Sequence, residues 1–355
     1  MPSGCGYFAT NYKADIAILD TRFRRFWFWV MIGAIIIFPL VTPSYWVHRV
    51  NLVSIACVAA LGLQLLTGYT GMISLGHAGF LCAGGFTAAI LGFEAGLPFY
   101  VVIPASMVVG ALLGAIAGIP ALRFRGIYVI LSTMAMYFII VLFAGEYQSR
   151  GVYTSGYRIP PPSIGGWVLD SSREWYYVLA FLTFVVAIFC INLIRSRVGR
   201  AWIAIRDNDI AATVLGVNIG YYKLLAFIFS SSLASLAGCV SAYYMGYAAI
   251  DDYHFWLNIT YIAIIIIGGL GSIMGVFLGS FFIILLPYVL SDATGLLPFG
   301  GALQSIAFPI QFGLFGFFII LFLLVEPEGL VGIWRRIRTF FELWPFKYHR
   351  VISTR

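Results

Sequence analysis

Long apolar runs, separated by short polar or glycine-rich stretches, dominate the chain from about residue 26 onward. Ten such runs are visible, at 26–47, 50–67, 76–93, 98–119, 127–145, 175–194, 222–249, 259–272, 274–291 and 309–325. Most approach the roughly 20 apolar residues that a helix needs to cross a bilayer. Lipid offers the backbone no hydrogen-bond partner, so spanning segments of this kind form helices. Several runs touch or are cut by glycine. The pattern therefore predicts an all-α polytopic membrane protein with about 8–10 transmembrane helices, some of them glycine-broken.

The composition supports a membrane protein and excludes three other classes. Of the 355 residues, 61% are hydrophobic and 10% are charged, whereas soluble domains average about 45–50% apolar and about 25% charged residues. An ordinary soluble enzyme, a disordered chain and a secreted disulfide scaffold are therefore excluded. The five cysteines are scattered without a C-x-x-C pair. This distribution is typical of small buried side chains rather than of a metal or redox site.

The basic residues indicate how the chain is oriented in the membrane. The formal charge of +7 arises from 21 lysines and arginines against 14 acidic residues. Seventeen of the basic residues fall in the two tails, in the loop after the fourth run and in the loop before the seventh run. The other four fall on the opposite side, at Arg49, Arg150, Arg158 and Arg173. Basic residues gather on the cytoplasmic side of membrane proteins, which predicts that both termini are cytoplasmic. Because these charges lie between apolar runs, no nucleic-acid partner is expected.

The same pattern divides the chain into two tails and one membrane domain. We expect a cytoplasmic N-terminal tail at 1–25, a transmembrane domain at 26–334 and a basic cytoplasmic tail at 335–355. The first apolar run is long enough to span, so it predicts a retained helix rather than a cleaved signal peptide. The outside loop at 146–174 is either a docking platform or a plain connector. No segment is long enough for a soluble catalytic or nucleotide-binding domain.

Two glycine-rich breaks interrupt the apolar runs. The first contains Gly68, Tyr69, Thr70, Gly71, Ser74, Gly76 and His77, and the second contains Gly268, Gly269 and Gly271. Glycine weakens helices and allows close backbone approach. Non-helical backbone at membrane depth occurs only inside protein or along a water-filled cavity. Each break is therefore a candidate for either a substrate pathway or a tight helix crossing. For His77 alone, a structural hydrogen bond to a neighbouring helix is favoured over a functional role.

Two ladders of small residues predict close helix packing. Gly110, Gly114 and Gly118 recur every four residues, as do Gly271, Gly275 and Gly279. G-x-x-x-G on an apolar helix lets two backbones come together. The second ladder does not have the spacing of a phosphate-binding loop, and no Lys-Ser or Lys-Thr follows it, so nucleotide binding there is not expected.

The cytoplasmic loop at 195–221 mixes charged and apolar residues in a pattern that predicts one or two short amphipathic helices. Such helices lie on a membrane or in the groove of a partner protein. A transporter driven by a separate soluble subunit needs a rigid cytoplasmic element of this kind. The candidate coupling residues in this loop are Arg200, Arg206, Ala211, Ala212 and Gly216.

This loop also carries a family resemblance. Ala211, Ala212 and Gly216 have the spacing of the core of the coupling motif in ABC importer permeases, and the flanking residues resemble the branched-chain amino acid permease family, LivM type. Further matches follow in the family's order, at Gly68-Tyr69-Thr70-Gly71, Ser74-Leu75-Gly76-His77, 122–128, 268–272 and Pro327-x-Gly329-Leu330. The motif departs from the broader pattern because Ile210 replaces its glutamate, so the role of that glutamate is not transferred.

The resemblance implies a pore-forming subunit in the bacterial inner membrane. Family members pair with a LivH-type sister permease, two cytoplasmic ABC ATPase subunits and a periplasmic substrate-binding protein. By this resemblance the chain is not an enzyme and binds no cofactor or metal, while its partner subunits use ATP. Family substrates are branched-chain and other amino acids, and relatives move urea, short amides or aromatic carboxylates. Specificity resides mostly in the binding protein, so the substrate is not determined by this sequence.

Two other functions compete with this interpretation. A self-sufficient secondary transporter or channel would explain the two glycine breaks, which occupy corresponding places in the two halves, but not the coupling-like loop. Ion-coupled carriers also need ionisable groups near the midplane, and here Glu94, Asp251, Asp252 and Asp292 fall at the ends of the runs. An intramembrane enzyme would need convergent catalytic groups. The four histidines are far apart and form no ligand motif.

Overall fold

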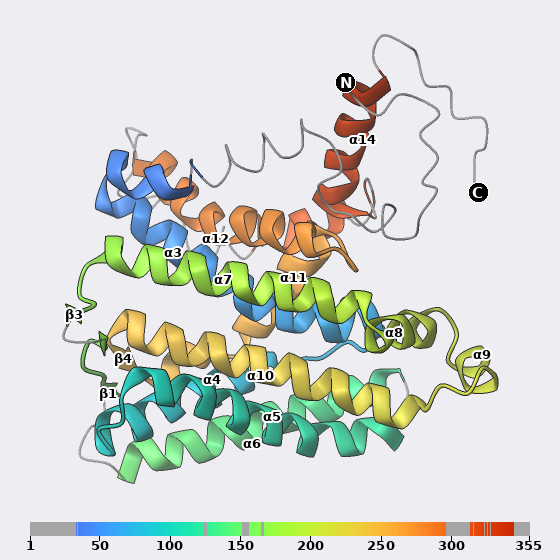
Figure 1. Ribbon diagram of the computed structural model, residues 1–355, viewed down its shortest axis with the longest axis horizontal. Helices are drawn as coiled ribbons and strands as arrows, with labels where there is room; N and C mark the ends of the chain where they lie inside the picture. Colours follow the sequence, from blue (N-terminus) through green and yellow to red (C-terminus); the bar gives the residue numbers. More distant parts are fainter. Residues whose placement is uncertain are drawn as a thin grey trace.

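The computed structural model describes the chain apart from residues 1–32, 34, 124–125, 151–155, 165–166, 296–312, 315, 323, 325, 327 and 344–355. The predicted N-terminal tail at 1–25, the first third of the first apolar run and the end of the predicted C-terminal tail lie outside the described residues. The described part forms an elongated bundle of roughly parallel and antiparallel helices (Figure 1).

The first half of the bundle contains α3 (Ser44–Leu63), the π-helix η1 (Gln64–Tyr69), α4 (His77–Thr87), the π-helix η2 (Ala88–Glu94), α5 (Phe99–Arg123) and α6 (Ile127–Arg150). The second half contains α7 (Ser172–Arg195), α8 (Arg197–Asp207), α9 (Asp209–Val214), α10 (Ile219–Met245), the 3-10 helix η3 (Ile250–Tyr253), α11 (Trp256–Gly268), α12 (Ile273–Gly295) and α14 (Gly329–Leu343). Two antiparallel pairs of two-residue strands complete the described part, β1 (Tyr157–Arg158) with β4 (Tyr247–Ala248) and β2 (Ser163–Ile164) with β3 (Trp167–Val168).

Five helical segments of the described chain are long and apolar enough to cross a membrane, at Ser44–Tyr69, Phe99–Leu122, Tyr128–Arg150, Ser172–Arg195 and Ile219–Met245. Two shorter apolar helices, Trp256–Gly268 and Ile273–Val289, lie beside them. The prediction of an all-α polytopic membrane protein is therefore confirmed.

Among the helix boundaries that differ from the sequence pattern, two have a clear local reason. The helix α3 begins at Ser44, inside the predicted first run, because Pro43 is extended (φ −58°, ψ 150°) and has no N–H to continue a helix across that point. The helix α10 ends at Met245 rather than at 249 because Gly246 adopts a left-handed conformation (φ 75°) that closes the helix.

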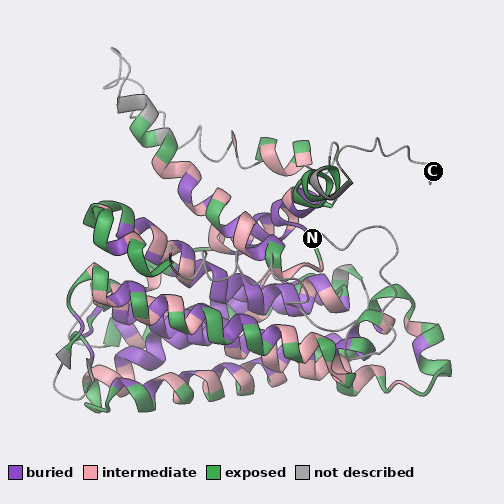
Figure 2. Ribbon diagram, turned by 45° about the horizontal axis from the view of Figure 1, so that its top comes forward, coloured by how far each residue is buried: buried purple, intermediate pink, exposed green. Residues whose placement is uncertain are grey.

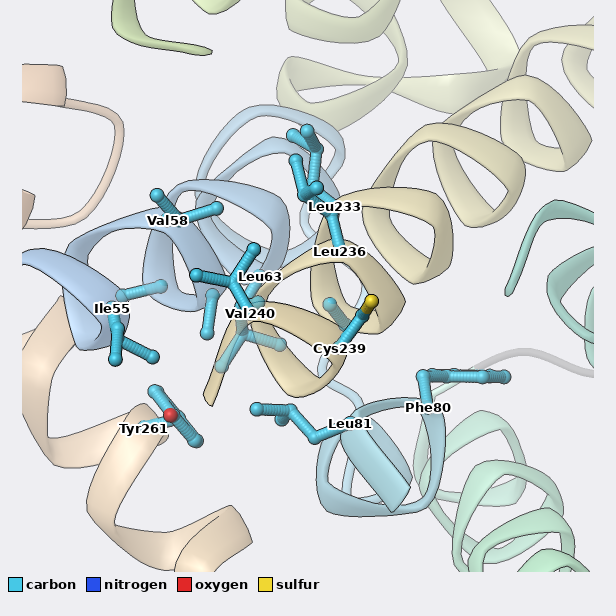
Figure 3. Packing of buried hydrophobic residues seen from close by; sticks show 14 of the residues in the cluster. Ile55, Val58, Leu63, Phe80, Leu81, Leu233, Leu236, Cys239, Val240 and Tyr261 are labelled. Atoms are coloured by element: carbon cyan, nitrogen blue, oxygen red, sulfur yellow. The ribbon is translucent and has the colours of Figure 1, made fainter. Parts of the chain in front are cut away.

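The centre of the bundle is formed by α3 and α10. In the most apolar 18-residue stretch of α3 and η1, 83% is buried inside the structure. In the corresponding stretch of α7, only 28% is buried. Figure 2 shows the buried residues along the middle of the bundle and exposed residues on the outer helices. Figure 3 shows side chains of this buried cluster, among them Leu63 of α3, Val240 of α10 and Leu81 of α4. The outer apolar faces of α5, α6 and α7 are consistent with contact to lipid or to another subunit.

The ladder of glycines on α5 produces the close crossing that the sequence predicted. A Cβ added at Gly110 would lie 2.6 Å from the Ser231 carbonyl oxygen of α10, and one at Gly118 would lie 2.8 Å from Leu224. At Gly114 a Cβ would collide with the Ser231 hydroxyl. The backbones of α5 and α10 therefore approach each other to a distance that only glycine permits along this face.

The two ends of the bundle carry different elements (Figure 1). At one end lie the short strands and an ion pair between Arg49 and Asp292 at 3.0 Å. The Arg49 guanidinium carbon also lies 3.7 Å from the centre of the Tyr45 ring, which adds a cation–π contact. At the opposite end α8 and α9 extend beyond the bundle. We refer to α8, α9 and the C-cap residue Leu215 together (197–215) as the arm.

Candidate coupling site between the glycine breaks and the arm

The first glycine break is a non-helical segment between two buried helices. The π-helix η1 ends at Tyr69, residues 71–76 have no helical structure, and α4 begins at His77. Gly71 adopts a left-handed conformation (φ 73°), which favours glycine. A Cβ on Gly76 would lie 2.5 Å from the Thr133 carbonyl oxygen of α6, so this position requires close backbone approach. The break is thus both a change of direction and a tight crossing.

The polar residues of the first break form hydrogen bonds with other residues of this chain. The Thr70 hydroxyl donates to the Leu66 carbonyl, and the buried Ser74 hydroxyl accepts from the Gly76 N–H at 3.2 Å. Tyr69 is half-buried and packs against the main core. A ring nitrogen of His77 lies 2.9 Å from the Ala59 carbonyl oxygen, and its ring meets Tyr261 edge-on at 5.3 Å. His77 thus has the neighbouring-helix hydrogen bond that the structural interpretation requires.

The second glycine break connects α11 to α12 and lies directly against the first. Gly269 and Gly271 have positive φ values of 123° and 78°. A Cβ on Gly68 would lie 2.9 Å from the Gly271 nitrogen. The two breaks therefore meet although about 200 residues separate them in the sequence, and each glycine is needed for the contact or for its backbone conformation.

Gln64 holds the two breaks together and was missed by the sequence analysis. Its side-chain nitrogen donates to the Gly269 carbonyl at 3.0 Å and to the Ser272 carbonyl at 3.1 Å. Gln64 is almost fully buried. A buried amide inside an apolar run is costly unless it is hydrogen-bonded, so its presence in the run 50–67 was the signal that could have found it. Gly268 and Gly275 also pack backbone against backbone, which closes the α11–α12 hairpin.

The arm consists of two helices, as the amphipathic pattern predicted. The Ser196 hydroxyl accepts from the Val198 N–H and caps α8, and the Asn208 side chain accepts from the N–H groups of Ile210 and Ala211 and caps α9. Trp202 of α8 is completely buried, and its indole N–H donates to the Tyr222 carbonyl of α10 at 2.8 Å. The arm is therefore attached firmly to the bundle.

The structure separates the candidate coupling residues into different environments. Ala212 is only 1% exposed and packs inside this chain. Ala211 and Gly216 are exposed, and Gly216 has a left-handed conformation (φ 84°) with open space around it. Arg200 is exposed and donates to the Arg195 carbonyl at 3.1 Å. The apolar surface offered at the tip of the arm comes from other residues, Ile210, Val214 and Leu215, which are largely exposed.

Arg206 connects the arm to both glycine breaks. Its guanidinium donates a hydrogen bond to the Gly68 carbonyl at 2.5 Å. A Cβ placed on Gly271 would lie 2.8 Å from the same guanidinium, and one on Gly71 would lie 3.4 Å from the Arg206 Cγ. The sequence assigned Arg206 to the loop surface, where it would meet a partner. The structure shows that Arg206 is exposed and that its guanidinium also reaches the Gly68 carbonyl.

A pocket of about 650 Å³ lies between the first break, the start of α6 and the arm. Its lining includes apolar side chains such as Ile73 and Val129 together with Arg206, Asp207 and Lys223. Movement of the arm would change the shape of this pocket, because the arm supplies one of its walls. Among the described residues, no group of three or more histidine, cysteine or acidic side chains is arranged to hold a metal ion.

A bundle of apolar helices with two glycine breaks in contact and a projecting arm is the architecture of a polytopic membrane protein. Residues 47–325 match the family described as branched-chain amino acid transport system / permease component. The match covers most of the chain, so the chain belongs to this family, as its motifs indicated. It is a permease subunit rather than an enzyme.

Several characterised relatives are similar over most of their length. The High-affinity branched-chain amino acid transport system permease protein LivM of Escherichia coli K12 is 27% identical over 84% of this chain and 72% of its own length. The Autoinducer 2 import system permease protein LsrC of Klebsiella pneumoniae is 27% identical over 72% of this chain and 75% of its own. The High-affinity branched-chain amino acid transport system permease protein LivH of Salmonella typhimurium is 24% identical over 80% of this chain and 94% of its own length. No solved structure matches.

Proposed function

We propose that this chain is the transmembrane permease subunit of an ATP-driven importer, in which it forms one half of the translocation pathway. The observation that carries the proposal is the arm, whose apolar tip is exposed and whose Arg206 contacts the glycine breaks. One of two cytoplasmic ABC ATPase subunits would bind the tip, and the two subunits would hydrolyse ATP. A LivH-type sister permease would supply the other half of the pathway, and a periplasmic binding protein would deliver the substrate.

The geometry supports a specific transmission route. Force applied to α9 moves α8, because the two helices share the Asn208 junction and Trp202 anchors α8 to α10. Arg206 then passes the movement to the Gly68 carbonyl. Residues 71–76 have no helical hydrogen bonds to break, so this segment can change shape at lower cost than a continuous helix.

For the substrate we propose branched-chain or related amino acids, on the basis of the family. The related permeases LivM and LivH belong by name to branched-chain amino acid systems, and LsrC belongs to an autoinducer 2 system. Because members of the family also move urea, short amides or aromatic carboxylates, these compounds should be tested as well. Binding assays with the partner binding protein would identify the substrate, because that protein selects it before it reaches this chain.

Purification of the tagged permease from native membranes tests the proposed function. We expect a second permease and an ABC ATPase to co-purify, and we expect uptake into proteoliposomes to require ATP. The contact between the two glycine breaks also fits the alternative of a secondary transporter. Uptake by this chain alone, driven by an ion gradient and without an ATPase, would establish that alternative.

We further propose that the arm is cytoplasmic and that the short strands face outward, in the bacterial inner membrane. The basic residues of the arm and the sparse basic residues near the strands support this orientation. In intact cells, a membrane-impermeant thiol reagent should label Arg158→Cys but not Arg200→Cys, in a background without the native cysteines. Permeabilised cells should show labelling at both positions. The opposite pattern in intact cells would reverse the proposed orientation.

A further inference from the structure

The helix α14 extends away from the bundle and exposes most of its length. Every residue from Ile333 to Phe340 is exposed. Its large apolar residues form one stripe, at Ile333, Trp334, Ile337 and Phe340. This spacing of one, four and seven residues places them on one side of a helix. Arg335, Arg336 and Arg338 lie on the other sides. The boundary at 334–335 that the sequence suggested falls within this single helix.

The helix α14 runs across the bundle rather than along it. Figure 1 shows it running across the long axis of the bundle, and Figure 2 shows it almost end-on while that axis stays horizontal. The long axis is the direction in which the spanning helices cross the membrane. A helix that runs across this direction extends along the membrane surface, which is the orientation of an interfacial helix.

The base of α14 is fixed to the second glycine break, close to the arm. A Cβ on Gly269 would lie 2.6 Å from the Glu328 carbonyl oxygen and 3.5 Å from Val331. Two ion pairs brace the base, Arg336 with Glu326 at 2.6 Å and Arg335 with Glu328 at 3.0 Å. Both arginine side chains nevertheless remain mostly exposed, so they also present positive charge to the surroundings.

We propose that α14 lies in the headgroup layer of the leaflet on the arm side and binds anionic phospholipids. The apolar stripe faces the acyl chains, and the arginines extend toward the phosphate groups along their own aliphatic stems. Tryptophan is favoured at this depth, and an anionic leaflet attracts arginines at its surface. A protein contact would have to cover an exposed stripe flanked by three arginines, whereas an anionic lipid surface complements both at once.

This placement of α14 would also fix the position of the second glycine break within the membrane. Because its base contacts Gly269, a helix held at the headgroup layer keeps the α11–α12 turn at a fixed depth. The arm contacts the same region through Arg206. The second break would thus be held by the lipid surface on one side and approached by the moving arm on the other.

The depth of α14 is measured in the reconstituted complex with an environment-sensitive fluorophore on Ile337→Cys, in a variant without the native cysteines. Thr339→Cys, on the polar side of the same helix, is the matched control. In nanodiscs containing phosphatidylglycerol we expect emission at shorter wavelength and quenching by headgroup-depth spin-labelled lipid at position 337, and much weaker quenching at 339. In phosphatidylcholine alone the quenching at 337 should decrease.

Arg335→Gln combined with Arg338→Gln should remove the phosphatidylglycerol dependence, whereas the corresponding lysine pair should keep it. Emission typical of water at 337 would overturn the proposal, as would short-wavelength emission without lipid quenching, which would indicate a covering subunit. Equal quenching in both lipid mixtures would overturn the recognition of anionic headgroups. None of these readouts depends on transport, so their failure is distinct from a failure of the proposed importer function.

Discussion

Replacing Val214 and Leu215 together with glutamate is expected to abolish ATP-driven uptake while leaving the permease in the membrane. The two side chains are 84% and 80% exposed at the tip of the arm, where an ATPase groove would bury them. Full burial of two aliphatic side chains of this size contributes about 3–6 kcal/mol, which corresponds to roughly a hundredfold or more in affinity. Two introduced charges would also have to leave water. Substrate-stimulated ATP hydrolysis and uptake in proteoliposomes measure the loss.

The control for this pair keeps the apolar character of the tip. Val214→Ile with Leu215→Met should retain uptake near the parental level. Ala212→Glu is unsuitable, because Ala212 is already buried within this chain and the substitution would disrupt the arm itself. Gly216→Glu would also be strained by the positive φ of that residue, whatever binds there. Parental uptake and hydrolysis in the double glutamate variant would mean that the arm is an ordinary interfacial helix.

Replacing Arg206 with alanine is expected to reduce uptake about tenfold while the complex still assembles and hydrolyses ATP. A hydrogen bond from a charged donor contributes about 1.5–3 kcal/mol, and the exposure of Arg206 to solvent favours the lower value. The substitution should weaken the transmission of movement from the arm to the glycine breaks, because the tip that would bind the ATPase is unchanged. Uptake and ATP hydrolysis measured on the same proteoliposomes give the number of substrate molecules moved per ATP, which should fall.

Two further variants separate transmission from simple loss of charge. Arg197→Ala removes the same charge from the other end of α8, and it should leave the transport ratio unchanged. Arg206→Lys should fall between the parent and Arg206→Ala, because lysine keeps the charge but cannot reproduce the planar fork of arginine. An unchanged ratio in Arg206→Ala would show that the contact with Gly68 has no part in coupling.

The sequence determined the class of this protein and the position of its unusual segments. Long apolar runs predict spanning helices because the cost of exposing backbone to lipid is local and depends on composition alone. Glycine-rich breaks and the amphipathic loop at 195–221 are likewise local patterns, so the structure contains both. The ladder on α5 predicted a close helix crossing, although it did not identify α10 as the partner.

Only the tertiary structure decided how these segments meet. Gln64 donates hydrogen bonds to the carbonyls of Gly269 and Ser272, which are about 200 residues away in the sequence. No local sequence pattern indicates a contact between residues so far apart. Arg206 and Ala212 share one short amphipathic stretch, yet one reaches the glycine breaks and the other is buried against its own chain. Periodicity shows which side of a helix is apolar, but not what that side contacts. That choice depends on the packing of distant helices, because each contact requires two surfaces that the chain brings together only when it folds.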